Sequence, residues 1–370
     1  MKKGTSLYLD IVRFSAAFMV FLEHIREHTK HAFSHFWASH PFWYTHSNPY
    51  SQTAVIVFFV LSGYVIAHVL ATRENTPLEY AASRLARLYS VVAPALLLTV
   101  ACNCFIALRY PTAFQAFEAN GAPGVALSYL GTALFMGCFW LWPELQTPNT
   151  PFWSLSFEAS YYVGIALSVF TRGAARILSL VVLALVAGPS IVLLAPTWLL
   201  GYGAYHLWQR RQLRPRLALP VWLGSGVLLL MCPFIELQFR QPLPFLRMPD
   251  HHLGELLASY AASVCFAANI FAIGSLADGA ERLLSPIANT VRWLGSLTFA
   301  LYLFHQPLLS FFTVYSMPDR SSVSQAIFEI GGTLLVVATL GRVCEQSKGA
   351  YKKWIVSLWA RTWTRPALSN

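Results

Sequence analysis

The sequence predicts an all-α polytopic membrane protein, and its composition, its long apolar runs and the placement of its basic residues each indicate that class. Hydrophobic residues make up 56% of the 370 positions and charged residues 11%, which is too apolar for a soluble domain of this length. No second composition zone and no internal repeat divides the chain. We therefore expect one transmembrane domain over residues 1–346 and a basic cytoplasmic tail over residues 347–370.

Apolar runs long enough to cross a bilayer give about ten expected transmembrane helices. They lie near residues 7–26, 53–72, 88–109, 152–171, 175–194, 196–209, 218–237, 254–277, 291–314 and 323–343. A further apolar piece at 125–142 would put several arginines on the outer side if it crossed the bilayer. We expect that piece to be re-entrant or interfacial, which is tolerated where protein covers the backbone.

The basic residues set the expected orientation, with the N- and C-termini in the cytoplasm. In this topology the 26 Lys and Arg residues gather on the inner side, with few exceptions. The exceptions are Arg26, Lys30, Arg109, Arg240, Arg247 and Arg320. The net charge of +10 therefore follows the positive-inside rule, and we expect no nucleic-acid partner.

The first expected span carries two polar groups that a bilayer disfavours, Arg13 and His24. Eleven helical steps of about 100° make three turns and about 20°, so both side chains share one face, about 16 Å apart along the axis. Ionisable groups inside a span mark functional sites by default. The alternative is a snorkelling arginine at the inner interface and an interfacial histidine toward the outer side.

Three further arginines lie on the expected inner side. Arg84 and Arg87 are one turn apart in the inner loop just before the third span, and this spacing suits the capture of phosphates. Arg73 follows the second span. Each of the three is also consistent with a simple topology anchor.

Polar groups also occur in the later spans. Glu158 is predicted about 9 Å along a helix from residue 152, and His305 about 21 Å from residue 291, which places both in the outer half. If Glu158 contacted His24, it would orient the imidazole and raise its basicity. A buried structural glutamate is the alternative. Ser62 and Gly63 fall in the middle of the second span, where a packing role is favoured.

His24, His28, His31 and His35 recur at helical spacing, which is one pattern of a metal site. The surrounding segment is generally rich in His and aromatic residues and lacks a carboxylate or Cys at matching spacing. We therefore expect no metal.

Taken in order, these motifs resemble the membrane acyltransferase-3 family, which includes bacterial O-antigen and exopolysaccharide O-acetyltransferases. The resemblance rests on motifs spread along the chain. They are the Arg13-to-His24 spacing after Leu9-Asp10, the Phe-Phe-Val-Leu-Ser-Gly-Tyr run at 58–64, the Arg84/Arg87 pair, the Trp-Ser-Leu-Ser-Phe-Glu run at 153–158, and the segment from Gly295 to His305. Ile11 stands where Gly is usual in the family, and Thr298-Phe299 stands where Ser-Tyr is common.

The resemblance implies an O-acyltransferase of the bacterial cytoplasmic (inner) membrane. It would move an acyl group, most commonly acetyl, from cytoplasmic acyl-CoA to a hydroxyl of a sugar or related acceptor at the outer side. In this interpretation His24 and Glu158 are catalytic, and Arg13, Arg73, Arg84 and Arg87 bind the phosphates of acetyl-CoA. Ser62, Trp153, Ser154 and His305 contact substrate. The expected partners are acyl-CoA, a glycan or other hydroxyl-bearing acceptor, and membrane lipid. A multi-span transporter of a small molecule or lipid-linked sugar is the alternative.

Overall fold

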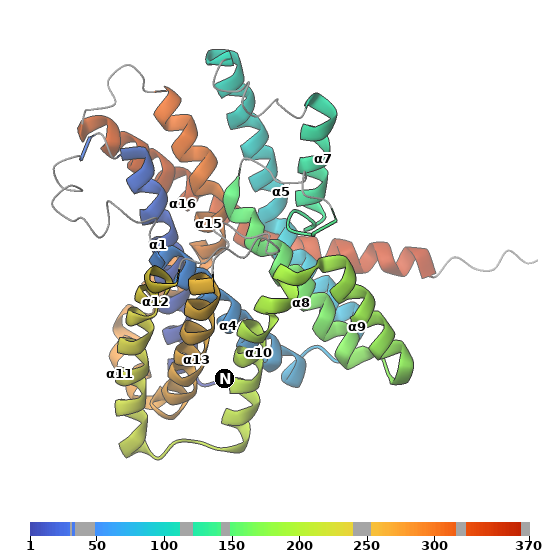
Figure 1. Cartoon of the computed structure of the whole chain (residues 1–370), viewed down its shortest axis with the longest axis vertical. Helices are drawn as coiled ribbons and strands as arrows, with labels where there is room; N and C mark the ends of the chain where they lie inside the picture. The colour runs from blue at the N-terminus through green and yellow to red at the C-terminus, as the bar shows by residue number, and fades with distance from the viewer. Residues whose placement is uncertain are drawn as a thin grey trace, which may run out of the picture.

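The computed structural model describes residues 1–29, 32–33, 49–111, 121–141, 149–239, 253–315 and 323–363. Within these ranges the chain is helical and contains no strand, as Figure 1 shows. An apolar chain in lipid must satisfy its backbone hydrogen bonds internally, and helices do this within each segment. The predicted all-α class is confirmed.

The described residues form a succession of helices. In chain order they are α1 (Lys3–Thr29), α4 (Pro49–Thr72), α5 (Pro77–Arg109), α7 (Gly121–Ala133), the 3-10 turn η1 (Thr150–Phe152), α8 (Trp153–Phe170), α9 (Gly173–Ala187), α10 (Pro189–Arg210), α11 (Pro215–Met231), α12 (Pro233–Gln238), α13 (Leu253–Ser275), α14 (Ala277–Leu284), the 3-10 turn η2 (Ser285–Ile287), α15 (Ala288–Tyr315) and α16 (Val323–Trp363).

In the described ranges, seven helical stretches are long and apolar enough to cross a membrane, or eight if the bent pair α9 and α10 forms one span. The chain is thus a multi-pass membrane protein. Helix α8 is not among the seven, and its sequence carries Glu158 with several serines and tyrosines. Helix α7 has 13 residues, or about 20 Å, too short for the hydrocarbon core. This agrees with the expectation that segment 125–142 does not form a full span.

The break between the fifth and sixth expected spans lies seven residues earlier than predicted. The sequence placed it before Pro196, but Pro196 lies inside α10. The chain instead bends by 120° between α9 and α10, at Gly188, whose φ of 93° suits glycine. Pro189 then opens α10, where its missing N–H costs nothing.

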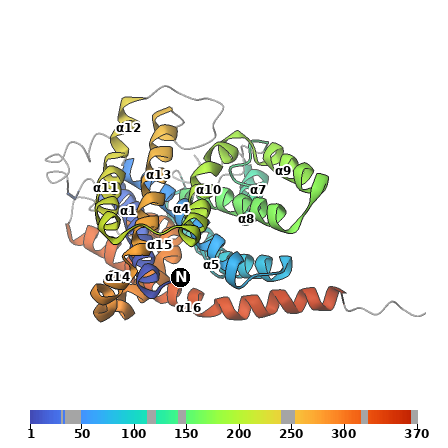
Figure 2. The same ribbon diagram turned by 90° about the horizontal axis from the view of Figure 1, so that it is seen from below.

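Helix α16 extends well beyond its expected span. It runs for 41 residues to Trp363, so the beginning of the expected tail at 347–370 continues the last helix. Residues 364–370 lie outside the described residues. In Figures 1 and 2 the C-terminal part of α16 projects past the other helices.

Helices α4 and α15 lie at the centre of the bundle. In each of their apolar stretches 67% of the residues are buried, against 22% for α11. Helix α1 packs against α4, α14 and α15, while α10 packs against α4 and α13. Figure 2 shows α1, α4, α13 and α15 grouped together, with α8, α9 and α10 on the other side of α4.

Helices α4 and α10 cross with their backbones in contact, because each presents a glycine to the other. A methyl group on Gly63 would overlap the Trp198 carbonyl, and one on Gly201 would overlap the Val60 carbonyl. The crossing therefore depends on the absence of side chains at these two positions.

We expect Gly201→Ala to destabilise the protein by about 1–3 kcal/mol, since backbone on the facing helix cannot move aside easily. Gly203, on the same helix, has open space around it, and Gly203→Ala is expected to be neutral or stabilising by up to about 1 kcal/mol. Thermal unfolding of the purified variants in detergent compares them. Equal melting temperatures for both variants would contradict the close crossing.

Candidate functional site

Helices α1, α4, α5, α8 and α15 line a narrow cavity in which apolar walls surround a group of charged and hydroxyl side chains. The space open to the centres of water molecules is about 60 Å³, which holds only a few waters. The lining residues come from all five helices. They are Arg13, Val55, Phe58, Phe59, Leu61, Ser62, Val65, Ile66, Arg84, Arg87, Ser154, Leu155, Glu158, Tyr162, Thr298, Phe299 and Tyr302.

Three of the four predicted donor-binding arginines line this cavity. Arg13 comes from α1 and lies 3.5 Å from the carboxylate of Asp10. Arg87 comes from α5, and both Arg13 and Arg87 lie within electrostatic range of Glu158. Lys348 of α16 also interacts electrostatically with these two arginines. The cavity thus has a strongly cationic end, which suits an anionic ligand.

The start of α5 holds its arginines in place. Thr76 caps the helix, its side-chain oxygen accepting from the Glu79 backbone N–H at 3.2 Å, and Pro77 occupies the first turn. About two turns after Pro77, Arg84 is buried and donates to Glu74 at 2.9 Å. Its guanidinium also faces the rings of Tyr80 and Tyr162 at 5.6 and 5.8 Å.

Arg73 does not join this group. It follows the last turn of α4, is exposed and is not among the residues that line the cavity. A donor-binding role for Arg73 stays a prediction that the geometry does not support.

Glu158 lies in a hydrogen-bonded cluster beside the arginines. Ser62 donates to its carboxylate at 2.8 Å, and the Tyr162 hydroxyl also donates to it. Ser62 and Tyr162 contact each other at 3.2 Å. The prediction that Glu158 contacts His24 is therefore wrong: its partners are two hydroxyls and the nearby cations.

The position of Glu158 follows from where α8 begins. The depth predicted for Glu158 places residue 152 at the outer surface. In the structure Asn149, just before η1, is buried and donates to the Leu303 carbonyl in the middle of α15, at 3.0 Å. Gln306 also donates to the Thr150 hydroxyl at 3.2 Å. Since α8 starts beside the middle of α15, Glu158 lies closer to the arginine end than its helix position suggested.

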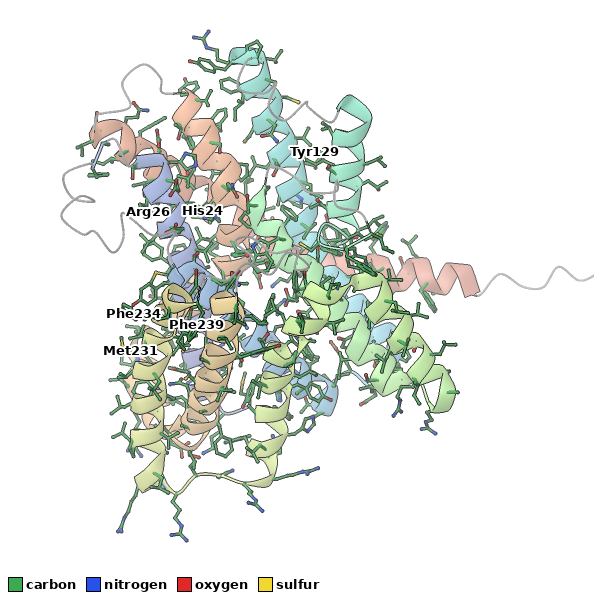
Figure 3. All side chains as sticks on the ribbon, in the orientation of Figure 1. His24, Arg26, Tyr129, Met231, Phe234 and Phe239 are labelled. Carbon is green, nitrogen blue, oxygen red and sulfur yellow. The ribbon has the colours of Figure 1, made fainter. Side chains whose placement is uncertain are left out.

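His24 has a different partner, His305 of α15. The Nε2 atom of His305 lies 3.1 Å from Nδ1 of His24, with the ring centroids 4.8 Å apart. Each ring also contacts its own helix: Nδ1 of His24 lies 3.0 Å from the Val20 carbonyl. Nδ1 of His305 lies 2.8 Å from the Leu301 carbonyl. His24 lies in the C-terminal half of α1, where Figure 3 labels it.

The remaining predicted substrate residues divide into two groups. Ser154 lines the cavity and contacts the Tyr302 hydroxyl at 2.8 Å. Trp153 instead packs edge-on against Phe59 and Phe157, at centroid distances of 6.4 and 5.3 Å. Tyr302 lies three residues before His305 on α15, so the histidine pair lies one turn beyond the cavity wall.

Sequence reasoning missed two tyrosines and one lysine of this region. Tyr162 and Tyr302 both line the cavity, and Lys348 approaches its cationic end. Tyr162 follows Glu158 by one turn and Tyr302 precedes His305 by one turn, so the helical period was the signal that would have found them. Nothing in the sequence around Lys348 distinguishes it from the other basic residues of the inner side.

The described residues include no group of three or more His, Cys, Asp or Glu side chains placed to hold a metal ion. His28 contacts the Thr313 hydroxyl at 2.9 Å. His31 and His35 lie outside the described residues.

The comparisons with known proteins identify the family. The family model described as an acyltransferase domain, Acyl_transf_3, matches residues 6–342, which is nearly the whole chain. No curated protein and no solved structure matches the chain. The residues that line the cavity, from Arg13 to Tyr302, all lie within the matched range. The chain therefore belongs to the acyltransferase-3 family of membrane proteins.

Proposed function

We propose that this membrane acyltransferase moves an acyl group, with acetyl as the first candidate, from cytoplasmic acyl-CoA to a hydroxyl of a sugar or related acceptor at the outer side. One observation carries the proposal. Arg13 of the cationic cavity end and His24 of the imidazole pair both lie on α1, about 16 Å apart along its axis, and α15 carries both His305 and the cavity-lining Tyr302. A pantetheine arm has a comparable length, so phosphates at the arginines would present the thioester near the histidines.

In the proposed reaction, His24 takes the proton of the acceptor hydroxyl as that oxygen attacks the thioester carbonyl. The carbon–sulfur bond breaks, the acyl group stays on the acceptor oxygen, and the coenzyme A thiolate recovers the proton from the imidazolium. Arg13, Arg84 and Arg87 hold the donor phosphates. Glu158, with Ser62 and Tyr162, keeps the arginines fixed between reactions.

The cavity in this structure is too narrow for the donor. About 60 Å³ of water-accessible space does not admit a pantetheine arm, so donor binding requires the lining helices to separate. The rings of Phe58 and Tyr302, whose centroids lie 5.7 Å apart, line the cavity wall, and Tyr302 is one helical turn from His305. They are the side chains we expect to move.

The experiment that tests this function uses the purified protein in liposomes with acetyl-CoA labelled in its acetyl group. Cell-surface glycans of the expressing host serve as acceptor. The expected result is labelled glycan, together with free coenzyme A. Mass spectrometry of the product would locate the acyl group on its acceptor oxygen. If no label is transferred while a solute crosses the liposome membrane, the protein is a transporter and the proposal fails.

Arg87→Gln should raise the KM for acetyl-CoA by about 10- to 100-fold, the effect of losing one charge-assisted hydrogen bond of about 1.5–3 kcal/mol. We expect kcat to change little, because the arginine positions the donor and does not react. Arg282, an exposed arginine of α14, supplies the control variant Arg282→Gln, which should leave KM unchanged. An unaltered KM for acetyl-CoA in Arg87→Gln would mean that Arg87 does not bind the donor and serves only as a topology anchor.

A further inference from the structure

The contacts of the histidine pair fix where its protons lie. A carbonyl oxygen can only accept a hydrogen bond. The Nδ1 atom of His305, 2.8 Å from the Leu301 carbonyl, therefore carries a hydrogen. The same reasoning places a hydrogen on Nδ1 of His24, which lies 3.0 Å from the Val20 carbonyl.

The contact between the rings then has one consistent direction. With its hydrogen on Nδ1, neutral His305 has a lone pair on Nε2, and this atom lies 3.1 Å from Nδ1 of His24. The N–H of His24 is thus shared between the Val20 carbonyl and His305. If Nε2 of His305 instead donated to Nδ1 of His24, the lone pair of that Nδ1 would face the lone pairs of the Val20 carbonyl, which is repulsive. Nε2 of His24 is consequently the ring nitrogen with a free lone pair.

The surroundings of His305 leave its ring nitrogens little opportunity for further contacts. Its side chain is fully buried (0% exposed), and Phe21 of α1 packs edge-on against the ring, with centroids 5.9 Å apart. A buried imidazole without access to water must satisfy both nitrogens within the protein. The Leu301 carbonyl and His24 do this completely, so direct substrate contact through a ring nitrogen, as the sequence predicted, would break one of these bonds.

We propose that His305 is a positioning residue that holds His24 in the tautomer with Nε2 as the reacting atom. This inference rests on the proposed function of His24. When Nε2 of His24 takes the acceptor proton, the positive charge spreads to its Nδ1–H, and the bond to His305 becomes charge-assisted and stronger. His305 thus does for His24 what a carboxylate does in a hydrolase triad, without placing a second charge in the bundle.

A pair of substitutions separates positioning from packing. In His305→Gln the side-chain amide reaches the place of Nε2 and can still accept from His24. In His305→Asn the amide reaches only the place of Nδ1 and can bond to the Leu301 carbonyl but not to His24. We expect His305→Gln to keep kcat within about tenfold of wild type and His305→Asn to lose about 100-fold, as for other residues that orient a reacting imidazole. The KM for acetyl-CoA should stay unchanged in both.

Equal kcat values in the two variants, whether both normal or both reduced, would overturn the inference. A second measurement is independent of turnover: ¹⁵N NMR of the histidine-labelled protein, with the His24 signals assigned by their loss in His24→Ala. The expected result is a protonated Nδ1 and an unprotonated Nε2, and the reverse tautomer contradicts the inference even if a variant does not fold. If wild type transfers no acetyl group, the proposed function fails, and the tautomer measurement alone decides this inference.

Discussion

His24→Ala is expected to abolish acyl transfer while the protein remains folded in the membrane. His24 is only partly buried and its side-chain contacts are with the Val20 carbonyl and His305, so its removal leaves one acceptor of His305 unpaired and little else disturbed. Loss of general-base catalysis costs about 10²- to 10⁴-fold, which brings acetyl transfer from acetyl-CoA close to the background rate. The measurement is labelled-acetyl transfer by the reconstituted variant.

A matched control comes from another histidine of the bundle. His206 of α10 is exposed and contacts only the rings of Tyr202 and Tyr205 among the described aromatic pairs. His206→Ala should keep full activity. If His24→Ala is folded and transfers acetyl at the wild-type rate, the reaction does not pass through this imidazole, and the mechanism proposed above is wrong.

Arg84→Ala is expected to destabilise the protein by about 3–5 kcal/mol, because it leaves a buried carboxylate without its partner. Arg84 and Glu74 are both almost fully buried, with 10% and 7% of their side chains exposed. The change also removes the guanidinium from the rings of Tyr80 and Tyr162. Thermal unfolding in detergent measures the loss, and a wild-type melting temperature would show that the pair is not buried in solution.

The double variant Arg84→Met/Glu74→Leu separates the two roles of this arginine. Replacing a buried ion pair by apolar side chains of similar size is often neutral or stabilising, so we expect most of the lost stability to return. The KM for acetyl-CoA should remain raised if Arg84 also binds the donor. The exposed pair of Lys2 and Asp278, 3.0 Å apart, is the control, since breaking it with Asp278→Ala should cost no more than about 1 kcal/mol.

The first helix illustrates what the sequence could predict. Helical periodicity placed Arg13 and His24 on one face, and Arg13 indeed lines the cavity while His24 contacts α15 beyond it. Such predictions use only distances along one helix, and a regular helix keeps them. The helical class and most span positions follow equally directly from apolar run length.

The partners of these residues could not be predicted, because they depend on how helices pack. His24 and His305 are 281 positions apart, and depth along a span says nothing about which way a side chain points around the axis. Glu158 shows a second limit. Its predicted depth assumed that α8 starts at the membrane surface, whereas Asn149 anchors that start beside Leu303. A buried entry of this kind is held by a few side-chain hydrogen bonds and leaves no trace in hydropathy.

The narrow cavity has a consequence for proton movement through the bundle. Carboxylate, hydroxyl and imidazole groups that follow one another through a bundle can pass protons when water connects them. The cavity has room for only a few water molecules, and Phe58, Phe299 and Tyr302 lie on its wall. So narrow a space leaves little room for the continuous file of water molecules that a proton leak along these groups would require.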